Sequence, residues 1–427
     1  MGFSDRLGLA HIAQIASTQG DLFLNCGTSG DANSSVKRPA HPIGEHEYSM
    51  NTTTDFIILG AGIAGASIGY FLAPHGRCVM LERESQPGYH STGRSAAQFI
   101  ATYGTPQVRA LSRASEQFFQ HPPAGFAEAP LLHPRGLLTF AGEADLATLE
   151  HAWAVLKQTT ATGRWLSAEE ACAMVPVLRP EQVRAAILES ESFDMDVDAI
   201  HQGYLRGFKR AGGALLTDAE AVAIERVGEV WRASTAAGAV FEAPVLINAA
   251  GAWCDGVAQL AGVEPIGLVP KRRSAFTFPA PTGMDTSRWP LVLEVNESVY
   301  FKPDAGALLA SPVNEDPTHP QDVQPEEIDI ALAMHALETW TTLVVRPSHT
   351  WAGLRSFVAD GDLVAGFDTQ APGFFWCAAQ GGYGIQTSAA MGEACAALAR
   401  ELPMPEHLAA CGLTAQILSP SRKALQT

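Results

Sequence analysis

The sequence lacks the features of several large classes of protein. Its seven cysteines are scattered over 427 residues and never form a C-x-x-C pair, which argues against a disulfide framework and a cysteine-based zinc site. No run approaches the roughly 18 apolar residues that a membrane-spanning helix requires, and the N-terminus has no long apolar stretch before a small-residue cleavage site. We therefore expect a cytoplasmic protein with reduced thiols, no metal and no transmembrane segment.

Positive charge is also scarce. Lys and Arg total 28 against 45 Asp and Glu, and the formal net charge of -17 would repel a phosphate backbone, so nucleic acid is not expected as a partner. The composition, 47% apolar and 17% charged, is typical of a folded protein, and the length predicts about two or three domains. Residues 1–50, rich in Gly, Ser, Asn, His and Pro, are expected to be a disordered arm or an over-extended start.

The folded part of the chain is expected to open with a strand, a helix and a second strand. Residues 55–59 form a short apolar run that ends at glycines, which indicates a strand buried on both faces. Residues 64–74 and 77–82 then show the patterns of a helix and of another strand. Such a β-α-β unit is typical of the start of a dinucleotide-binding fold.

A glycine motif lies inside this unit. Residues 60–65 read GAGIAG and match G-x-G-x-x-G, and Glu82 ends the second strand about 20 residues later, where a ribose-binding carboxylate is expected. Gly60 would allow a tight turn, Gly62 would let backbone N–H groups approach a pyrophosphate, and Gly65 would let helix and strand pack closely. Because strand, motif, helix and carboxylate stand in this order, they predict a dinucleotide site rather than an unrelated glycine-rich turn.

The rest of the chain predicts both helices and strands. Helical spacing is found at residues 144–156, 167–174, 199–210 and 381–400. Strand patterns are found at residues 239–250, 274–278 and 298–301. The last two alternate in period two, as in an antiparallel sheet, and residues 312–327 are expected to form a surface loop.

Two polar signals mark the starts of helices. Ser167 is followed three residues later by Glu170, which predicts a capping box. Residues 194–198 read DMDVD and resemble the start of a calcium loop, but Ala199 and Leu205 stand where that loop needs a Gly and a Glu. We therefore expect an Asp N-cap on the following helix.

Two further segments favour FAD over a nicotinamide cofactor. Residues 88–97 read GYHSTGRSAA and offer many small hydrogen-bond donors, which can follow the ribityl chain and pyrophosphate of an extended flavin nucleotide. Residues 380–386 read QGGYGIQ and place glycines before a helix, where backbone N–H groups can stabilise negative charge on a reduced isoalloxazine.

With these segments in view, the chain resembles the D-amino acid oxidase superfamily of FAD-dependent oxidoreductases, and most closely the bacterial D-arginine dehydrogenases. The resemblance runs from about residue 55 to beyond residue 413. It rests on four segments, QPGYHSTGRSAA at 86–97, PKRRSAF at 270–276, WAGLRSF at 351–357 and QGGYGIQ at 380–386.

The resemblance implies an α/β fold with a discontinuous Rossmann-like FAD-binding domain and an α+β substrate domain whose antiparallel sheet roofs the flavin. The FAD-binding domain would comprise residues 51–128, 185–248 and 353–418, and the substrate domain residues 129–184 and 249–352.

FAD is expected to be bound non-covalently. Relatives of the sarcosine-oxidase type tether the flavin through a Cys near the second arginine segment, whereas residues 354–368 contain none. The resemblance assigns to the cofactor Gly60, Gly62, Ile63, Ala64, Gly65, Glu82, Arg83, Ser91, Thr92, Ser95, Ala96, Gln98, Ala221, Ala250, Gly251, Gly381, Gly382, Gly384, Ile385 and Gln386.

The resemblance also assigns the catalytic side chains. Arg273 and Arg355 would hold the α-carboxylate of the substrate, a task that suits the planar, permanently charged guanidinium. Tyr103 and Tyr300 would close over the substrate, and the carbonyl of Gly382 would accept a hydrogen bond from its amine. Judged without the resemblance, the arginines would be read as surface ion pairs and the tyrosines as half-buried core residues.

The reaction implied is oxidative deamination of a D-amino acid. A hydride would pass from Cα to flavin N5, and the resulting imino acid would hydrolyse to a 2-oxo acid and ammonia. The resemblance favours a dehydrogenase that passes its electrons to a quinone or another carrier rather than to oxygen.

The chain departs from D-arginine dehydrogenases where those enzymes recognise the substrate side chain. They carry a Glu just after a Pro-Arg pair, and the matching Pro134-Arg135-Gly136 is followed here by Leu137. They also carry a His where this chain has Gln98. We therefore expect apolar or neutral D-amino acids to be preferred over D-arginine, unless another acid such as Glu143 reaches the pocket.

Four alternatives stay open at the level of sequence. The same arginines would serve a secondary amine or imino acid such as sarcosine or proline, and an FAD-dependent 2-hydroxy acid dehydrogenase is a further possibility within enzymes. A flavin-dependent tRNA-modifying protein would want a basic surface, which the net charge of -17 opposes. A non-catalytic dinucleotide-binding module would bind a cofactor that no amine reduces.

Overall fold

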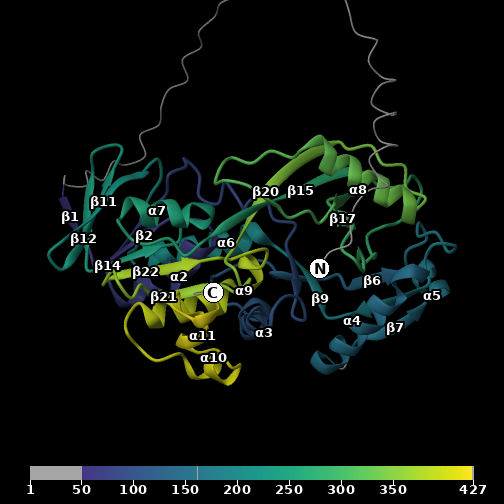
Figure 1. Ribbon diagram of the computed structural model, residues 1–427, viewed down its shortest axis with the longest axis horizontal. Coiled ribbons are helices and arrows are strands. Elements are labelled where there is room, and N and C mark those ends of the chain that lie inside the picture. The colour runs from purple at the N-terminus through teal and green to yellow at the C-terminus, as the bar shows by residue number, and fades with distance from the viewer. Residues whose placement is uncertain (1–50, 161, 426–427) are drawn as a thin grey trace, which may run out of the picture. The chain divides into compact units, whose positions relative to one another are not determined.

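The computed structural model describes residues 51–160 and 162–425. The expected N-terminal arm over residues 1–50 lies outside the described residues. The described chain belongs to one compact unit, in which two regions with separate hydrophobic cores lie side by side (Figure 1). Within this part of the chain, no helix has the length and apolar character needed to cross a bilayer.

The first region is built on a six-stranded sheet in which neighbouring strands are parallel, except for an antiparallel pair at one edge. In spatial order its strands are β10 (Ala214–Leu216), β3 (Cys78–Leu81), β2 (Phe56–Leu59), β14 (Val245–Asn248), β22 (Phe374–Ala378) and β21 (Val364–Phe367). Every residue of β2 is buried, which confirms the prediction of a strand covered on both faces, and every residue of β3 is buried as well.

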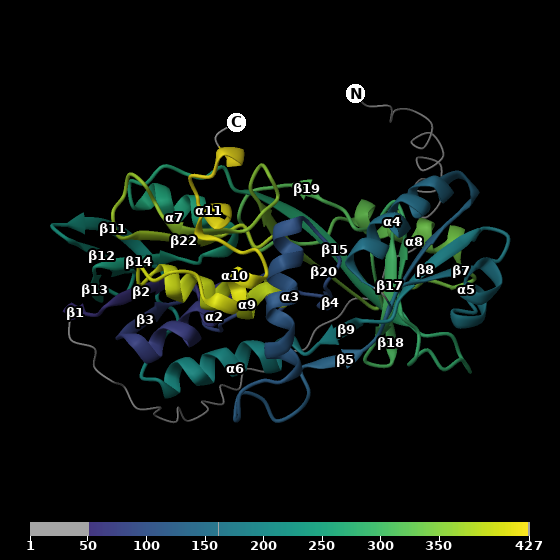
Figure 2. The same cartoon turned by 90° about the horizontal axis from the view of Figure 1, so that it is seen from below.

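Helices cover one face of this sheet and a smaller sheet covers the other (Figure 2). Ile58 of β2 packs with the helices α2 (Ile63–Leu72), α3 (Pro106–Gln120), α6 (Val197–Arg210) and α9 (Gly384–Leu398). Ile57 packs on the opposite face with α7 (Cys254–Leu260) and with the sheet of β1 (Asn51–Thr53), β13 (Val240–Ala243), β12 (Val230–Thr235) and β11 (Ala221–Val227). Two short helices, α10 (Glu406–Ala410) and α11 (Ala415–Leu418), follow α9.

The second region is built on a nine-stranded sheet that is antiparallel except between β16 and β6. In spatial order its strands are β19 (Asp316–Pro317), β15 (Val269–Pro279), β18 (Ala307–Ser311), β17 (Tyr300–Asp304), β16 (Leu291–Glu294), β6 (Leu137–Ala141), β8 (Ala185–Glu189) and β7 (Arg164–Ser167), and β20 (His349–Phe357) also pairs with β15. The helices of this region are α4 (Leu146–Thr159), α5 (Ala168–Met174) and α8 (Glu327–Trp340).

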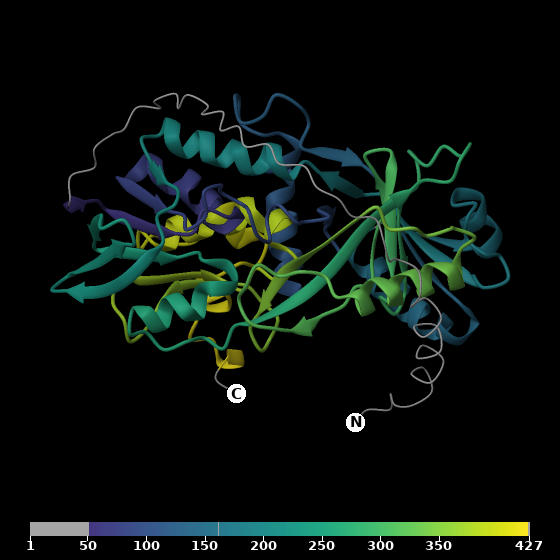
Figure 3. The same ribbon diagram turned by 90° about the horizontal axis from the view of Figure 1, so that it is seen from above.

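Two features join the regions. The long strands β15 and β20 run from the second region toward the first (Figure 3), and Ser356 at the end of β20 pairs with Gly381 just before α9. A three-stranded sheet of β4 (Gln98–Ile100), β9 (Ser192–Met195) and β5 (Leu132–Pro134) forms the other connection. The two regions agree with the expected α/β fold, while the residue ranges given above for two domains remain a prediction.

Most of the predicted elements are present. The helices expected at 144–156, 167–174, 199–210 and 381–400 correspond to α4, α5, α6 and α9. Both hydrogen bonds of the capping box form, since Glu170 N lies 3.2 Å from Ser167 Oγ and Ser167 N lies 2.9 Å from Glu170 Oε2. Asp196 caps α6 by accepting from Ala199 N at 2.9 Å, as expected of an Asp N-cap rather than a calcium loop.

Three boundaries are wrong, each because the sequence pattern hides a break. The strand expected at 239–250 is two strands in different sheets, since Pro244 between β13 and β14 has no N–H to donate. The helix expected at 64–74 ends at Leu72 and continues as a 3-10 turn that contains Pro74. The expected surface loop at 312–327 contains the short strand β19, which pairs with β15.

Candidate functional site

Two adjoining cavities lie where the two regions meet. The larger, about 300 Å³, lies at the carboxyl ends of β2, β3 and β14, and the smaller, about 110 Å³, lies beside β15 and β20. Six residues line both cavities, namely Ile63, Ser91, Thr92, Leu354, Gln380 and Gly381. The carboxyl ends of parallel strands are where such sheets bind their ligands.

The glycine motif shapes the floor of the larger cavity. Gly60 has φ 97°, and a Cβ there would lie 2.7 Å from Ala249 O, so a side chain is excluded by both conformation and space. Glu82 braces the turn, because its carboxylate accepts from Ala61 N at 2.8 Å and from Glu84 N at 2.9 Å. The turn leads directly into α2, whose N-terminus suits a pyrophosphate.

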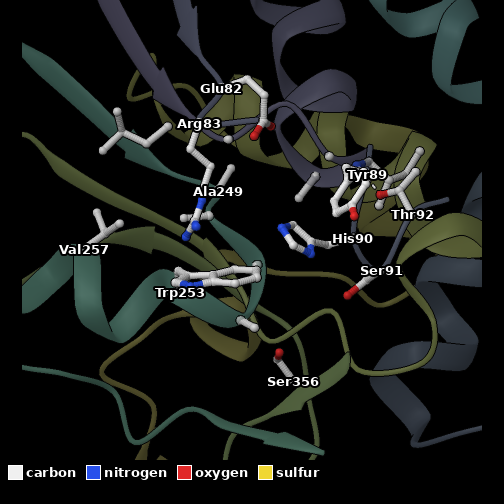
Figure 4. Close-up of a pocket in the computed structure, with 18 of the residues that line it drawn as sticks. Glu82, Arg83, Tyr89, His90, Ser91, Thr92, Ala249, Trp253, Val257 and Ser356 are labelled. Carbon is white, nitrogen blue, oxygen red and sulfur yellow. Dashed lines mark hydrogen bonds between the residues drawn. The ribbon is translucent and has the colours of Figure 1, made fainter. Parts of the chain in front are cut away.

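Side chains in contact with Trp253 form one wall of the larger cavity (Figure 4). The guanidinium of Arg83 lies 4.9 Å from the centre of the Trp253 ring, and the ring centres of His90 and Trp253 are 4.6 Å apart. Glu84 holds this group in place, since its Oε1 lies 2.8 Å from His90 Nε2 and 3.1 Å from Arg83 Nε. The wall offers aromatic and cationic surface to an adenosine group.

The residues present fit FAD, because the larger cavity has a glycine turn, a helix N-terminus and a carboxylate at one end and shares lining residues with the smaller cavity. Predicted cofactor residues that line the larger cavity are Gly60, Gly62, Ile63, Ala64, Glu82, Arg83, Ser91, Thr92, Ala221, Ala250, Gly251 and Gly381. Those that line the smaller cavity include Ser95, Ala96, Gly382, Gly384 and Ile385.

Three predicted cofactor residues line neither cavity. Gly65 of α2 packs directly against the glycine turn, since a Cβ at this position would lie 1.9 Å from Gly60 O. The side chain of Gln386 joins other elements, accepting from Ile100 N at 3.1 Å and donating to Ser112 Oγ at 2.9 Å. Gln98, also predicted for the substrate pocket, donates instead to protein oxygens near β6 and β9.

We expect the purified protein to be yellow and to release its FAD on treatment with acid or heat. Among the residues that the structure describes, no Cys lines the smaller cavity, so none of these thiols is placed there to form a covalent bond to a flavin ring. The absorbance spectrum of the supernatant after precipitation of the protein checks this. Colour that stays in the precipitate would show a covalent bond and contradict the expectation.

Two arginines converge on the smaller cavity, Arg273 from β15 and Arg355 from β20. Arg273 is only 8% exposed. Its Nε donates to Asn314 O at 2.8 Å, and its terminal nitrogen Nη2 donates to Glu315 Oε1 at 3.2 Å. Burial, and then repulsion by Arg355, lower the pKa of Arg273 to about 10, so it stays a cation at neutral pH.

Gly382 lies directly against the second arginine. A Cβ at this position would lie 2.7 Å from Arg355 Cζ, so a larger residue would require the guanidinium to move. Gly382 follows Gly381, whose φ is 55°, and both residues precede α9. The backbone at Gly382 therefore lies against the guanidinium of Arg355 and lines the same cavity.

The two predicted tyrosines have different surroundings. Tyr300, on β17, lines the smaller cavity and is 8% exposed. Tyr103 donates from its phenol to Glu297 Oε1 at 3.2 Å, and its ring lies 5.7 Å from that of Tyr383. Burial, and then the charge of Glu297, raise the pKa of Tyr103, so its phenol remains a hydrogen-bond donor.

Leu137 lies in an apolar cluster that borders the smaller cavity. It is 4% exposed and packs with Tyr300, Leu291, Leu309 and Val313, and Ala96 and Trp351 add to the cluster from the cavity wall. Glu143 does not reach this cavity, because its exposed carboxylate pairs with Arg184 on the surface at 2.9 Å. The exception named for Glu143 therefore does not apply.

The sequence prediction missed residues that the structure brings to the site. Trp253 and His90 lie in the wall of the larger cavity, and Tyr383 and Glu297 adjoin Tyr103. His90 and Tyr383 lie inside segments that the sequence marked, whereas Trp253 and Glu297 carried no local signal. Nowhere in residues 51–160 and 162–425 do three or more His, Cys, Asp or Glu side chains gather in a way that could hold a metal.

Comparison with known proteins identifies the relatives of the chain. Residues 55–398 match the family model described as FAD dependent oxidoreductase (DAO). The chain is 26% identical over 399 residues to FAD-dependent oxidoreductase domain-containing protein 1 of Xenopus laevis, covering 81% of this chain and 78% of that protein. It is 26% identical over 226 residues to L-2-hydroxyglutarate dehydrogenase of Escherichia coli (strain K12), covering 49% of this chain and 50% of that protein. Glycine oxidase from Geobacillus kaustophilus has the same fold, with a TM-score of 0.73 and 21% identity. The match covers 82% of this chain and 95% of that protein.

Proposed function

Because the chain belongs to the DAO family of FAD-dependent oxidoreductases, we propose that it oxidises D-amino acids at Cα. The observation that carries the proposal is the convergence of Arg273 and Arg355 on a cavity that adjoins the cofactor cavity. Two guanidinium groups in a small, largely buried space suit a carboxylate. The structurally similar glycine oxidase is named for an amino acid substrate, which supports the same class of substrate here.

In this proposal the side chains of the protein bind and orient the substrate. Arg355 and Arg273 hold the α-carboxylate, and Tyr300 and Tyr103 close over the bound molecule. The carbonyl of Gly382 accepts a hydrogen bond from the amine. FAD, when bound, supplies the acceptor for the hydride that leaves Cα, and the imino acid formed then hydrolyses to a 2-oxo acid and ammonia.

The proposal is tested by anaerobic mixing of the FAD-loaded protein with candidate substrates while the flavin absorbance is followed. D-amino acids are expected to bleach the flavin faster than their L-enantiomers, than sarcosine and proline, and than 2-hydroxy acids such as 2-hydroxyglutarate. Preferential bleaching by a cyclic or N-methyl amine, or by a hydroxy acid, would reassign the substrate class. A flavin that no compound of the panel reduces would contradict an enzyme of this kind. Reoxidation by quinones and by oxygen then tests the proposed preference for a carrier.

Among D-amino acids we expect D-Leu, D-Met, D-Phe or D-Tyr to exceed D-Arg in kcat/KM. Leu137 and its apolar neighbours favour an apolar side chain by about 25 cal/mol per Å² removed from water. A guanidinium without a charge partner in a partly desolvated site would cost several kcal/mol. Steady-state assays with each D-amino acid check this order.

Glu189 is a carboxylate next to Leu137 with which this order can be tested. It lies opposite Leu137 in the pairing of β6 with β8, and its Oε2 accepts from Thr102 Oγ1 at 2.5 Å. Burial raises its pKa, which favours the neutral acid. Suppose that kcat/KM for D-Arg is at least about tenfold above that for the apolar D-amino acids, and that Glu189→Gln abolishes this difference. Such a result would show that Glu189 pairs with the substrate guanidinium.

A further inference from the structure

A buried ion cluster of three side chains lies near the apolar side of the smaller cavity. Asp194 of β9 accepts from Lys302 Nζ at 2.8 Å through Oδ1 and from Arg135 Nε at 2.7 Å through Oδ2. The side chains of Lys302, Arg135 and Asp194 are 5%, 15% and 19% exposed. One carboxylate thus pairs with two cations, and the cluster keeps one net positive charge.

No further carboxylate removes this charge. In the described ranges 51–160 and 162–425, Lys302 and Arg135 form ion pairs with Asp194 alone, although Asp304 follows Lys302 by two residues on β17. The other contacts of Arg135 are with the carbonyl oxygens of Ser287 and Trp289. Because a carbonyl carries only a partial charge, the excess positive charge of the cluster remains.

Lys302 lies on the face of the nine-stranded sheet that borders the smaller cavity. It follows Tyr300 by two residues on β17, so the two side chains point to the same face and start about 7 Å apart along the strand. Lys302 also lies opposite Leu309 of β18, which packs with Leu137 and Tyr300 in the apolar cluster beside the cavity. The buried cation is therefore a neighbour of the groups that should receive the substrate side chain.

Glu189 is the acidic residue on the other side of Leu137, in the pairing of β6 with β8. Its carboxyl offsets the charge of the ion cluster only when it is ionised. Burial raises the pKa of Glu189 and so disfavours the ionised form, whereas Lys302 is held next to Asp194 as a cation. The field at the apolar side of the cavity is therefore positive.

We propose that Lys302 is a specificity-determining residue whose positive charge excludes substrates with a cationic side chain. The inference rests on the proposed function and names the substrate class more closely. An ammonium or guanidinium at the far end of a bound amino acid would approach Lys302 and meet a like charge, whereas a neutral side chain would not. Two unit charges about 10 Å apart, at an effective dielectric constant of about 20, change a binding constant by about tenfold.

The test uses three six-carbon carboxylates that differ in the charge at the far end. Hexanoate ends in a methyl group, 6-aminohexanoate in an ammonium and adipate in a second carboxylate. Calorimetric titration of the FAD-loaded protein gives their dissociation constants for the parent and for Lys302→Met, in which Asp194 and Arg135 remain as a neutral pair. Relative to hexanoate, we expect this variant to bind 6-aminohexanoate about tenfold more tightly and adipate about tenfold more weakly.

Three further variants complete the test. Arg135→Met removes the same unit of charge from the other side of Asp194, so it should shift both ratios in the same directions, and it carries the test if Lys302→Met does not fold. Lys302→Arg keeps the charge and should keep both ratios. Lys157→Met is the matched control, because Lys157 is exposed on α4 and outside both cavity linings.

The two charged ligands distinguish an electrostatic role from a structural one. A field shifts them in opposite directions, whereas a disturbed fold weakens all three ligands together. Unchanged ratios in Lys302→Met and Arg135→Met, or equal changes for all three ligands, would overturn the inference, and a parent that binds no hexanoate would overturn it together with the proposed carboxylate site.

The titration needs no turnover, so it still reports on Lys302 if no amine reduces the flavin and the proposed function fails. If D-amino acids reduce the flavin, D-Arg and its neutral analogue D-citrulline give a second measurement. The ratio of kcat/KM for D-Arg to that for D-citrulline should rise about tenfold in Lys302→Met.

Discussion

Replacement of Arg355 by Met is expected to lower kcat/KM by about 10² to 10⁴-fold while the fold and the FAD content stay unchanged. The substrate carboxylate would lose one of its two proposed cationic partners, and a broken buried charge pair costs about 3–5 kcal/mol. Arg355 lines this cavity, and the absence of an ion pair to the described acidic residues means that its loss leaves no protein carboxylate unpaired.

Arg273→Met should lower kcat/KM as well, although its interpretation is less direct. Arg273 pairs with Glu315 and donates to Asn314 O, so its loss also frees a carboxylate and a carbonyl beside the site. The comparison of the two variants therefore distinguishes the loss of substrate binding from a disturbance of the segment that carries Glu315.

Arg184→Met is a suitable control for both variants, because it makes the same chemical change at a residue outside the cavity linings. Arg184 pairs with Glu143 on the surface. Circular dichroism and the ratio of flavin to protein absorbance verify the fold and the FAD content of each variant, and steady-state assays give kcat/KM. An Arg355→Met protein within about threefold of the parent would show that Arg355 does not bind the carboxylate.

The parts of the fold that sequence reasoning predicted depend on contacts close in the chain. The apolar run of β2, the glycine turn and Glu82 fall within about 30 residues, and the structure joins them through the bond from Ala61 N to Glu82. The cap at Asp196 and the capping box at Ser167 likewise involve residues three positions apart. Such signals are read from spacing alone.

The missed features depend on pairing between distant segments. Glu315 lies in a stretch that reads as a loop, and its place follows from the pairing of two-residue β19 with β15, more than 40 positions away. Trp253 reaches Arg83 and His90 only because β14 lies beside β2 in the sheet. No periodicity in the sequence encodes these contacts, since they arise from tertiary register rather than local propensity.

The break at Pro244 shows the same limit within one segment. Residues 239–250 read as a single buried strand because the apolar pattern continues through the proline. In the structure β13 and β14 pair with different partners, β12 and β2, so the chain changes sheets at that point.

The roles assigned to Arg273, Arg355, Tyr103 and Tyr300 by resemblance are of another kind, because the structure gives their positions and only kinetic tests give their function.

Substitution of Gly65 by Ala is expected to be the most damaging change at the cofactor end. An added Cβ would lie 1.9 Å from Gly60 O and 3.0 Å from Gly60 C, and both atoms belong to the backbone of the glycine turn. Gly60 itself has φ 97° and is held from its other side, since a Cβ there would lie 2.7 Å from Ala249 O. Because the turn is close to backbone on both of these sides, we expect α2 to shift away from β2.

We expect such a shift to cost about 1–3 kcal/mol of stability, as overpacking in a filled core does, and to separate the N-terminus of α2 from the turn that should approach the pyrophosphate. Gly65→Ala should consequently be purified with little FAD, and its Tm should respond much less to added FAD than that of the parent. Gly69→Ala on the same helix is the matched control, because its Cβ would meet Met80 Cε and the Phe208 ring, which are side chains able to adjust, at a position outside both cavity linings. A Gly65→Ala protein with a full complement of FAD and the Tm of the parent would show that α2 can move without opening the turn, and that the close packing at Gly65 is not what the cofactor site requires.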